Sequence, residues 1–230
     1  MTDDRRNSDR AGAFHLLERM LFLSDAVFAI VLTLLVLDLH VPANVSDADL
    51  FRAILAMEPR LVAFALTFAL VSIFWIAHVT LLRRLQAFDW PVAWVNLALL
   101  FTIALTPFAS TLLGAYSVFG NAWRFYCLVL IAIGVAQAVL MLVTHRDHAR
   151  LLGGASRREF WYRFSRAISP CAAFAVCLAL SLMGLRQASV YLSFALVPLA
   201  LMLARLLIAG RPSPRAPTQA QTGSNVPAGD

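Results

Sequence analysis

Four polar side chains lie inside long apolar runs of this sequence. Ser24 and Asp25 lie near the start of the first run, His78 near the end of the second, and Asn96 near the start of the third. Their hydroxyl, carboxylate, imidazole and amide groups can donate and accept hydrogen bonds among themselves. Polar groups at such positions are costly and usually have a structural or functional duty. These four residues are therefore the first candidates for a site.

The positions of these residues predict that they meet. If each apolar run is a helix, Asp25, His78 and Asn96 each lie five or six residues from one end of their run, and the three ends share one side of the membrane. At a rise of about 1.5 Å per residue they lie at similar depth. Because a buried carboxylate needs a donor, we predict a hydrogen-bonded clamp of Ser24, Asp25, His78 and Asn96 that joins three helices. The alternative is a proton relay between Asp25 and His78.

The elements that must position these residues are transmembrane helices. Of the 230 residues, 60% are hydrophobic and 14% are charged, which is far from the composition of a soluble domain. The apolar runs are continuous, which favours helices over strands, and each is long enough to cross a bilayer. We predict an all-α integral membrane protein with six transmembrane helices, over about 19–39, 60–82, 91–113, 122–144, 167–185 and 188–209.

Arginine placement predicts the orientation of these helices. All 19 basic residues are arginine, and the net charge is +6. Arginines gather in the N-terminal tail, the second–third connection, the fourth–fifth connection and the C-terminal tail, whereas the other connections hold only Arg52, Arg60 and Arg186. Basic segments stay on the cytoplasmic side. We therefore expect both termini to be cytoplasmic, and we attribute the charge to topology rather than to binding of nucleic acid.

The same reading divides the chain into three parts. Residues 1–18 form a cytoplasmic N-terminal tail, 19–210 the six-helix membrane domain, and 211–230 a tail rich in Pro, Ala and Gly that we expect to be disordered. The first apolar run is too long, and too acidic at Asp25, for the core of a signal peptide.

A second face of the first helix is apolar. At 100° per residue, Ile30, Thr33, Leu34 and Leu37 fall within an arc of roughly 100°, and Asp25 lies about 140° from Ile30. The carboxylate and this stripe therefore cannot face the same neighbour. On periodicity alone the stripe is most simply a packing or lipid-facing surface, with Asp38 near its edge at the outer end.

Motifs of enzymes and metal sites do not occur in the sequence. H-E-x-x-H and G-x-S-x-G are missing, and the three cysteines lack metal-ligand spacing. We expect no enzymatic activity, no metal site and no cofactor.

Three ordered motifs carry a family resemblance. The segment "RMLFLSDAVFAIVLTLLVLDLHVP" resembles the signature of bacterial members of the transmembrane protein 175 family, potassium channels first known from endosomes and lysosomes. Arg19, Ser24 and Asp25 match its Arg-x-x-x-Phe-Ser-Asp element, whereas Leu23 replaces the phenylalanine. "FWIAHVTLLRRL", with Phe74, Trp75 and His78, resembles the end of the family's second helix. "WVNLALLFTIALTPF", with Asn96 and Pro107, resembles its third helix.

The resemblance implies a potassium-selective channel subunit in the cell membrane, as in a prokaryotic plasma membrane. It implies six helices per subunit and assembly as a homotetramer, with the first helix of each subunit lining the pore. The constriction then falls on Ile30, with Thr33 as a selectivity threonine and Leu34 and Leu37 completing the lining. Asp38 would lie at the outer mouth, where four carboxylates concentrate cations. Arg19, Ser24, Asp25, His78 and Asn96 would form a hydrogen-bond network that supports the pore helix.

Other functions remain open at this point. A proton-coupled secondary transporter would use Asp25 and His78, although the chain lacks the interrupted, paired helices of an inverted repeat. A membrane-embedded structural or assembly factor is compatible with the same sequence.

Overall fold

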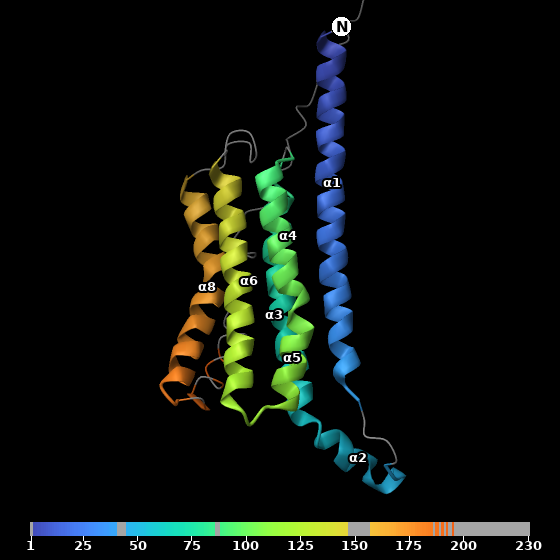
Figure 1. The fold of residues 1–230 in the computed structure, drawn as a ribbon, viewed down its shortest axis with the longest axis vertical. Coiled ribbons are helices and arrows are strands. Elements are labelled where there is room, and N and C mark those ends of the chain that lie inside the picture. The colour runs from blue at the N-terminus through green and yellow to red at the C-terminus, as the bar shows by residue number, and fades with distance from the viewer. Residues whose placement is uncertain are drawn as a thin grey trace, which may run out of the picture.

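The chain forms a bundle of long helices (Figure 1). The computed structural model describes residues 2–40, 45–85, 88–146 and 157–185, and the single positions 187, 188, 190, 192 and 195. Its elements are α1 (Thr2–Leu34), the 3-10 turn η1 (Leu35–Asp38), α2 (Asp47–Leu55), α3 (Glu58–Leu82), α4 (Trp90–Ala104), α5 (Thr106–Ala115), α6 (Gly120–Arg146) and α8 (Arg157–Leu182).

The predicted spans recur in this bundle. Four helical stretches of the described chain are long and apolar enough to cross a membrane, namely Phe14–Asp38, Glu58–Leu82, Trp90–Ala115 and Gly120–Arg146. They coincide with the first four predicted spans, and α8 contains most of the fifth. The all-α prediction is confirmed. The sixth span, except for a few single positions, and the tail at 211–230 lie outside the described residues.

Two features of the first third of the chain were not predicted. Helix α1 begins at Thr2, well before the predicted start of the first span at residue 19. The polar segment before Phe14 contains no proline, so nothing in it stops the apolar helix from extending toward the N-terminus. The connection after η1 contains the short helix α2, in which none of the residues is buried.

Successive long helices run in opposite directions. Helices α3 and α6 run toward the end of the bundle from which α1 extends, and α1, α4–α5 and α8 run away from it (Figure 1). Arg83 follows the end of α3 and Arg146 ends α6, so both arginines lie at that end. This arrangement is the one that the arginine pattern requires of the described helices.

The third span is divided between α4 and α5 at Leu105, because of a proline. Pro107 lacks a backbone N–H and cannot donate to the carbonyl of Ile103 four residues earlier. The hydroxyl of Thr106 donates to that carbonyl instead, at 2.7 Å. The span therefore continues past the break without leaving the carbonyl unpaired in an apolar environment, where an unpaired group is costly.

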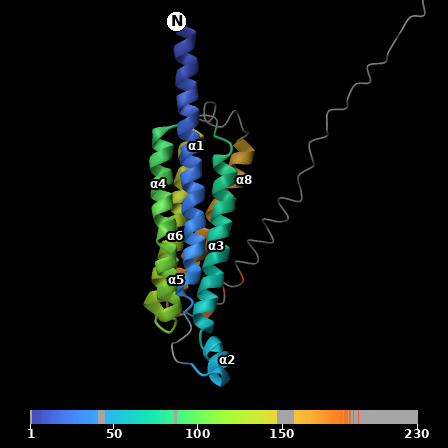
Figure 2. The ribbon, with the colours of Figure 1, turned by 90° about the vertical axis from the view of Figure 1, so that its right-hand side faces the viewer.

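Helix α1 packs on the bundle through one face only. It lies between α3 and α4 (Figure 2). Its buried residues recur every three or four positions, as expected for one stripe of a helix: Leu17, Met20, Ser24, Phe28 and Val31, followed by Leu35 in η1. The opposite face of α1 has no neighbour among the described helices.

Helices α6 and α8 approach each other closely at Gly134. A Cβ atom built on Gly134 of α6 would lie 2.4 Å from Cβ of Cys171 in α8. Only glycine permits this approach. Cys171 also directs its thiol toward the carbonyl of Ile131, at 3.7 Å, so here the cysteine acts as a small packing residue.

Candidate functional site

Ser24 and Asn96 join α1 to α4 by a buried hydrogen bond. The amide nitrogen Nδ2 of Asn96 donates to Oγ of Ser24 at 2.9 Å. The same Oγ donates its proton to the backbone carbonyl of Met20, also at 2.9 Å. Because the only proton of the hydroxyl is used within α1, Ser24 must accept from its neighbour. That requirement fixes the orientation of the Asn96 amide.

Asp25 faces α3, on the flank of α1. Its Oδ1 atom accepts a hydrogen bond from Nε1 of Trp75 at 3.0 Å. Indole N–H is a donor only, so this pairing suits a carboxylate at membrane depth. Trp75 belongs to the second resemblance motif, yet the depth argument did not identify it as the partner of Asp25.

His78 is fully buried between α1, α3 and α6. Its imidazole ring lies 5.4 Å from the ring of Phe28 on α1, measured between centroids. Asp25 is near enough to act on it electrostatically, and the side chain of Gln137 on α6 lies within reach. The two side chains do not have the close, aligned geometry of a formed hydrogen bond, since His78 Nδ1, His78 Nε2 and Gln137 Oε1 are buried without a partner.

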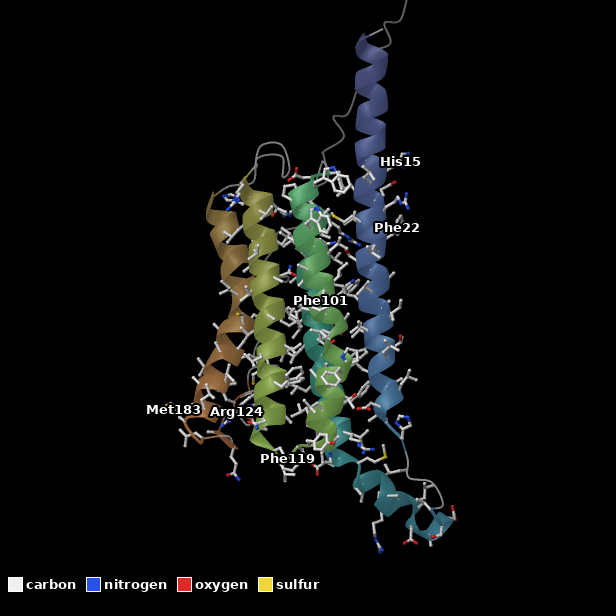
Figure 3. All side chains as sticks on the ribbon, in the orientation of Figure 1. His15, Phe22, Phe101, Phe119, Arg124 and Met183 are labelled. Atoms are coloured by element: carbon white, nitrogen blue, oxygen red, sulfur yellow. The ribbon has the colours of Figure 1, made fainter. Side chains whose placement is uncertain are left out.

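The structure forms one link of the predicted network, the hydrogen bond between Asn96 and Ser24. Asp25 is bonded to Trp75 and not to His78 or Asn96, and His78 feels the charge of Asp25 without a hydrogen bond to it. Arg19 is exposed and makes no side-chain hydrogen bond or ion pair within the described part of the chain. Phe22, beside the divergent Leu23, points away from the other helices (Figure 3) and is 72% exposed. Phe22 therefore does not fill the packing position of the missing phenylalanine within this subunit.

The predicted apolar stripe lies on the unpacked face of α1 and η1. Ile30 is 57% exposed and Leu37 62% exposed, and Thr33 and Leu34 are exposed as well. On an ideal helix Ile30 and Leu37 lie about 120–140° from the buried Ser24. Asp38, at the end of η1, is partly buried. The stripe is thus an apolar surface with one hydroxyl, directed away from the other described helices.

Thr33 has a defined hydrogen-bonding role on this surface. Its Oγ1 donates to the backbone carbonyl of Ile30 at 2.8 Å. Since the hydroxyl proton is used within the helix, the oxygen lone pairs remain free to accept from, or to coordinate, a group outside it. A ring of such hydroxyls would present oxygen ligands and no donors to a cation.

Two buried polar residues of α6 were missed in the sequence. Tyr126 shares a 3.0 Å hydrogen bond with Thr67 of α3. Gln137 lies near His78, which also belongs to α3. The signal that identifies them is available in the sequence: they are polar residues eleven positions apart in an apolar run, which places them on one face three turns apart. The motifs that carry the resemblance lie in the first three spans, whereas Tyr126 and Gln137 lie in the fourth.

Known proteins are similar to this chain over different shares of its length. The family model described as endosomal/lysosomal potassium channel TMEM175 matches residues 19–107. A potassium channel of Streptomyces collinus is 31% identical over 130 residues, which cover 54% of this chain and 63% of that protein. The crystal structure of a lysosomal potassium-selective channel TMEM175 homolog from Chamaesiphon minutus is 25% identical and superposes with a TM-score of 0.71, over 83% of this chain and 98% of the other.

Over residues 19–107 the chain resembles the TMEM175 family. The matched segment contains Arg19, Ser24, Asp25, His78 and Asn96, together with the whole exposed stripe. The human endosomal/lysosomal proton channel TMEM175 is 28% identical over 138 residues, which cover 60% of this chain and 27% of the human protein. The chain thus spans less than two thirds of the length of these curated TMEM175 relatives.

Proposed function

We propose that this chain is a subunit of a potassium-permeable channel whose pore is lined by α1. The observation that carries the proposal is the exposed stripe of Ile30, Thr33, Leu34 and Leu37 on a helix whose opposite face is anchored by Ser24. The relatives named as potassium channels support the choice of ion. A pore-lining helix needs both features, a rigid rear face and a free front face.

The stripe supports a specific permeation mechanism. Copies of Ile30 around a central axis would form an apolar constriction, which can gate by dewetting. Thr33 lies one turn away and would offer hydroxyl oxygens to a partly hydrated potassium ion. The chain contains no T-V-G-Y-G filter of backbone carbonyls, so selectivity would rest on side chains and on pore width.

The rest of the assembly follows from this proposal. A closed pore requires several copies of α1, and we propose a homotetramer in the plasma membrane of a prokaryote, with both termini in the cytoplasm. Asp38 would then form a fourfold carboxylate ring at the outer mouth. Asp38→Asn should lower the conductance at low salt, where screening is weak. An unchanged conductance would exclude this role.

A proton-coupled carrier built on Asp25 and His78 is less well supported. The carboxylate of Asp25 accepts a hydrogen bond from Trp75, which cannot pass a proton on as an imidazole can. Asp25 lies outside the exposed stripe of α1, and His78 lies on α3. A carrier would give a saturating flux coupled to a gradient, whereas a channel gives an ohmic current.

The deciding experiment is a planar-bilayer recording of the purified protein with asymmetric potassium and sodium. We expect an ohmic, potassium-selective current in the parent. Ile30→Asn should raise the current by hydrating the constriction, and Thr33→Ala should lower the preference for potassium. Ile76→Asn, the same change at an exposed isoleucine of α3, is the matched control and should leave the current unchanged. A folded parent oligomer without current would overturn the proposal.

A further inference from the structure

Helices α3 and α6 reach each other through buried side chains that recur at the same spacing on both helices. On α3, Thr67, Val71, Phe74 and His78 are all at most 2% exposed. On α6, the equally buried residues at the same spacing are Tyr126, Leu130, Ile133 and Gln137. Each stripe begins and ends with a polar residue and has two apolar residues between. Because the two helices run in the same direction, residues at one spacing on both can meet level by level.

The upstream polar pair is formed. Oγ1 of Thr67 and the hydroxyl of Tyr126 lie 3.0 Å apart, and Oγ1 of Thr67 also lies 2.7 Å from the carbonyl of Ala63. If Thr67 gives its proton to that carbonyl, the tyrosine hydroxyl is the donor of the pair. The downstream pair lies eleven residues further along both helices, or about 16.5 Å, where Gln137 approaches His78.

The atoms of the downstream pair complement each other. A neutral imidazole has one N–H donor, and Oε1 of Gln137 is an acceptor; all of these atoms are buried without a partner. Each unpaired polar group in a membrane interior is costly. A small rotation of the Gln137 amide would satisfy one group on each helix.

We propose that the pairs Thr67–Tyr126 and His78–Gln137 are two polar rungs that fix the register of α3 against α6, and that Gln137 acts through His78 as a positioning residue for α1. A helix that slides by one turn would break both rungs at once, whereas the apolar residues between them would tolerate the shift. His78 links the position of α3 to that of α1, because its ring packs on Phe28 in the buried face of α1. The second part of the proposal rests on the proposed channel function.

The register is tested by a double-mutant cycle and by a residue exchange, both measured through the thermal stability of the purified full-length protein. Thr67→Val and Tyr126→Phe should each lower Tm by about 2–4 °C, the shift that one lost hydrogen bond gives a chain of this size. The double variant should lose little more than either single variant, since both remove one interaction. Gln137→Met and the exchange of His78→Gln with Gln137→His probe the other rung, and the exchange should recover stability relative to Gln137→Met. Additive losses in the cycle, or a Tm unchanged by Gln137→Met, would overturn the two-rung register.

The positioning role is tested by the current of the same variants. Gln137→Met should lower the open fraction by up to about fivefold, the bias that one hydrogen bond supplies, and Gln137→Glu, which keeps an acceptor at the same place, should retain it. Tyr126→Phe weakens the rung that does not touch α1 and should leave the current of folded protein unchanged. Equal currents in Gln137→Met and Tyr126→Phe would overturn the positioning role. If the parent itself carries no current, the proposed function and this role fail together, and the stability measurements still decide the register.

Discussion

Helices α1 and α6 are the two most apolar spans of the described bundle and have equal mean hydropathy. Their burial differs twofold: 56% of the most apolar 18-residue stretch of α6 is buried, against 28% of that of α1. Apolar content reflects only the preference for leaving water. It does not say whether lipid, the same chain, a second copy or a narrow pore will cover the surface.

The two helices use their polar residues accordingly. Helix α6 is covered by α4, α5 and α8, and its Tyr126 and Gln137 are buried. On α1, Ser24 contacts α4, Asp25 contacts α3, and Ile30 and Thr33 are exposed. The same composition therefore serves two purposes, a core helix and a helix with one anchored and one free face.

The largest loss of stability from a change on either face of α1 is expected at Phe28. This side chain is 1% exposed, so Phe28→Ala should lower the free energy of unfolding by about 3–5 kcal/mol. Phe22→Ala is the matched control on the same helix, at a side chain that is 72% exposed. Thermal unfolding of the purified variants measures both. A loss at Phe22 equal to that at Phe28 would show that the outer face of α1 is packed after all.

The packed character of α6 is tested at Gly134. Gly134→Ala places a methyl group against Cys171, and α6 and α8 must separate to admit it. We expect a loss of about 1–3 kcal/mol, as for other overpacked cores. Gly12→Ala in α1, where no atom lies within 4 Å of the new Cβ, should be neutral or slightly stabilising. Similar unfolding temperatures for the two variants would contradict the close crossing.

The sideways contact of α1 is tested by Trp75→Phe, which removes the hydrogen bond to Asp25 and keeps most of the ring. The expected loss is about 1 kcal/mol. In an Asp25→Asn background the same substitution should cost less, because the charged acceptor is gone. Equal costs in both backgrounds would mean that the hydrogen bond contributes nothing to stability.

The smallest stability effect is expected at Ile30. Because this side chain is 57% exposed, Ile30→Ala should change the free energy of unfolding by less than about 0.5 kcal/mol. The current through reconstituted protein should change nonetheless, since the substitution widens the proposed constriction. A large loss of stability with an unchanged current would make the stripe a packing interface and not a pore lining.

Local motifs predicted many residues of the site, but few of the hydrogen bonds between them. Equal depth predicted that Ser24 and Asn96 lie close together, and they are hydrogen-bonded, because depth in a membrane helix follows directly from residue number. The partner of Asp25 was not predicted, since Trp75 and His78 lie three residues apart on α3 and only the rotation of that helix decides which of them donates. The roles of Arg19 and of the Ile30–Leu37 stripe stay predictions, because they concern groups that have no neighbour within one subunit.

The sequence by itself determined the positions of the described membrane-spanning helices and the two faces of α1, because apolar run length and a 100° periodicity are local properties. Only the tertiary structure decided that one face of α1 stays exposed, that Gly134 admits Cys171, and that Thr67 of α3 meets Tyr126 of α6. The physical reason is that packing depends on the rotation and register of whole helices. Many arrangements of equally apolar helices satisfy the same hydropathy, and side-chain fit and buried polar pairs select among them.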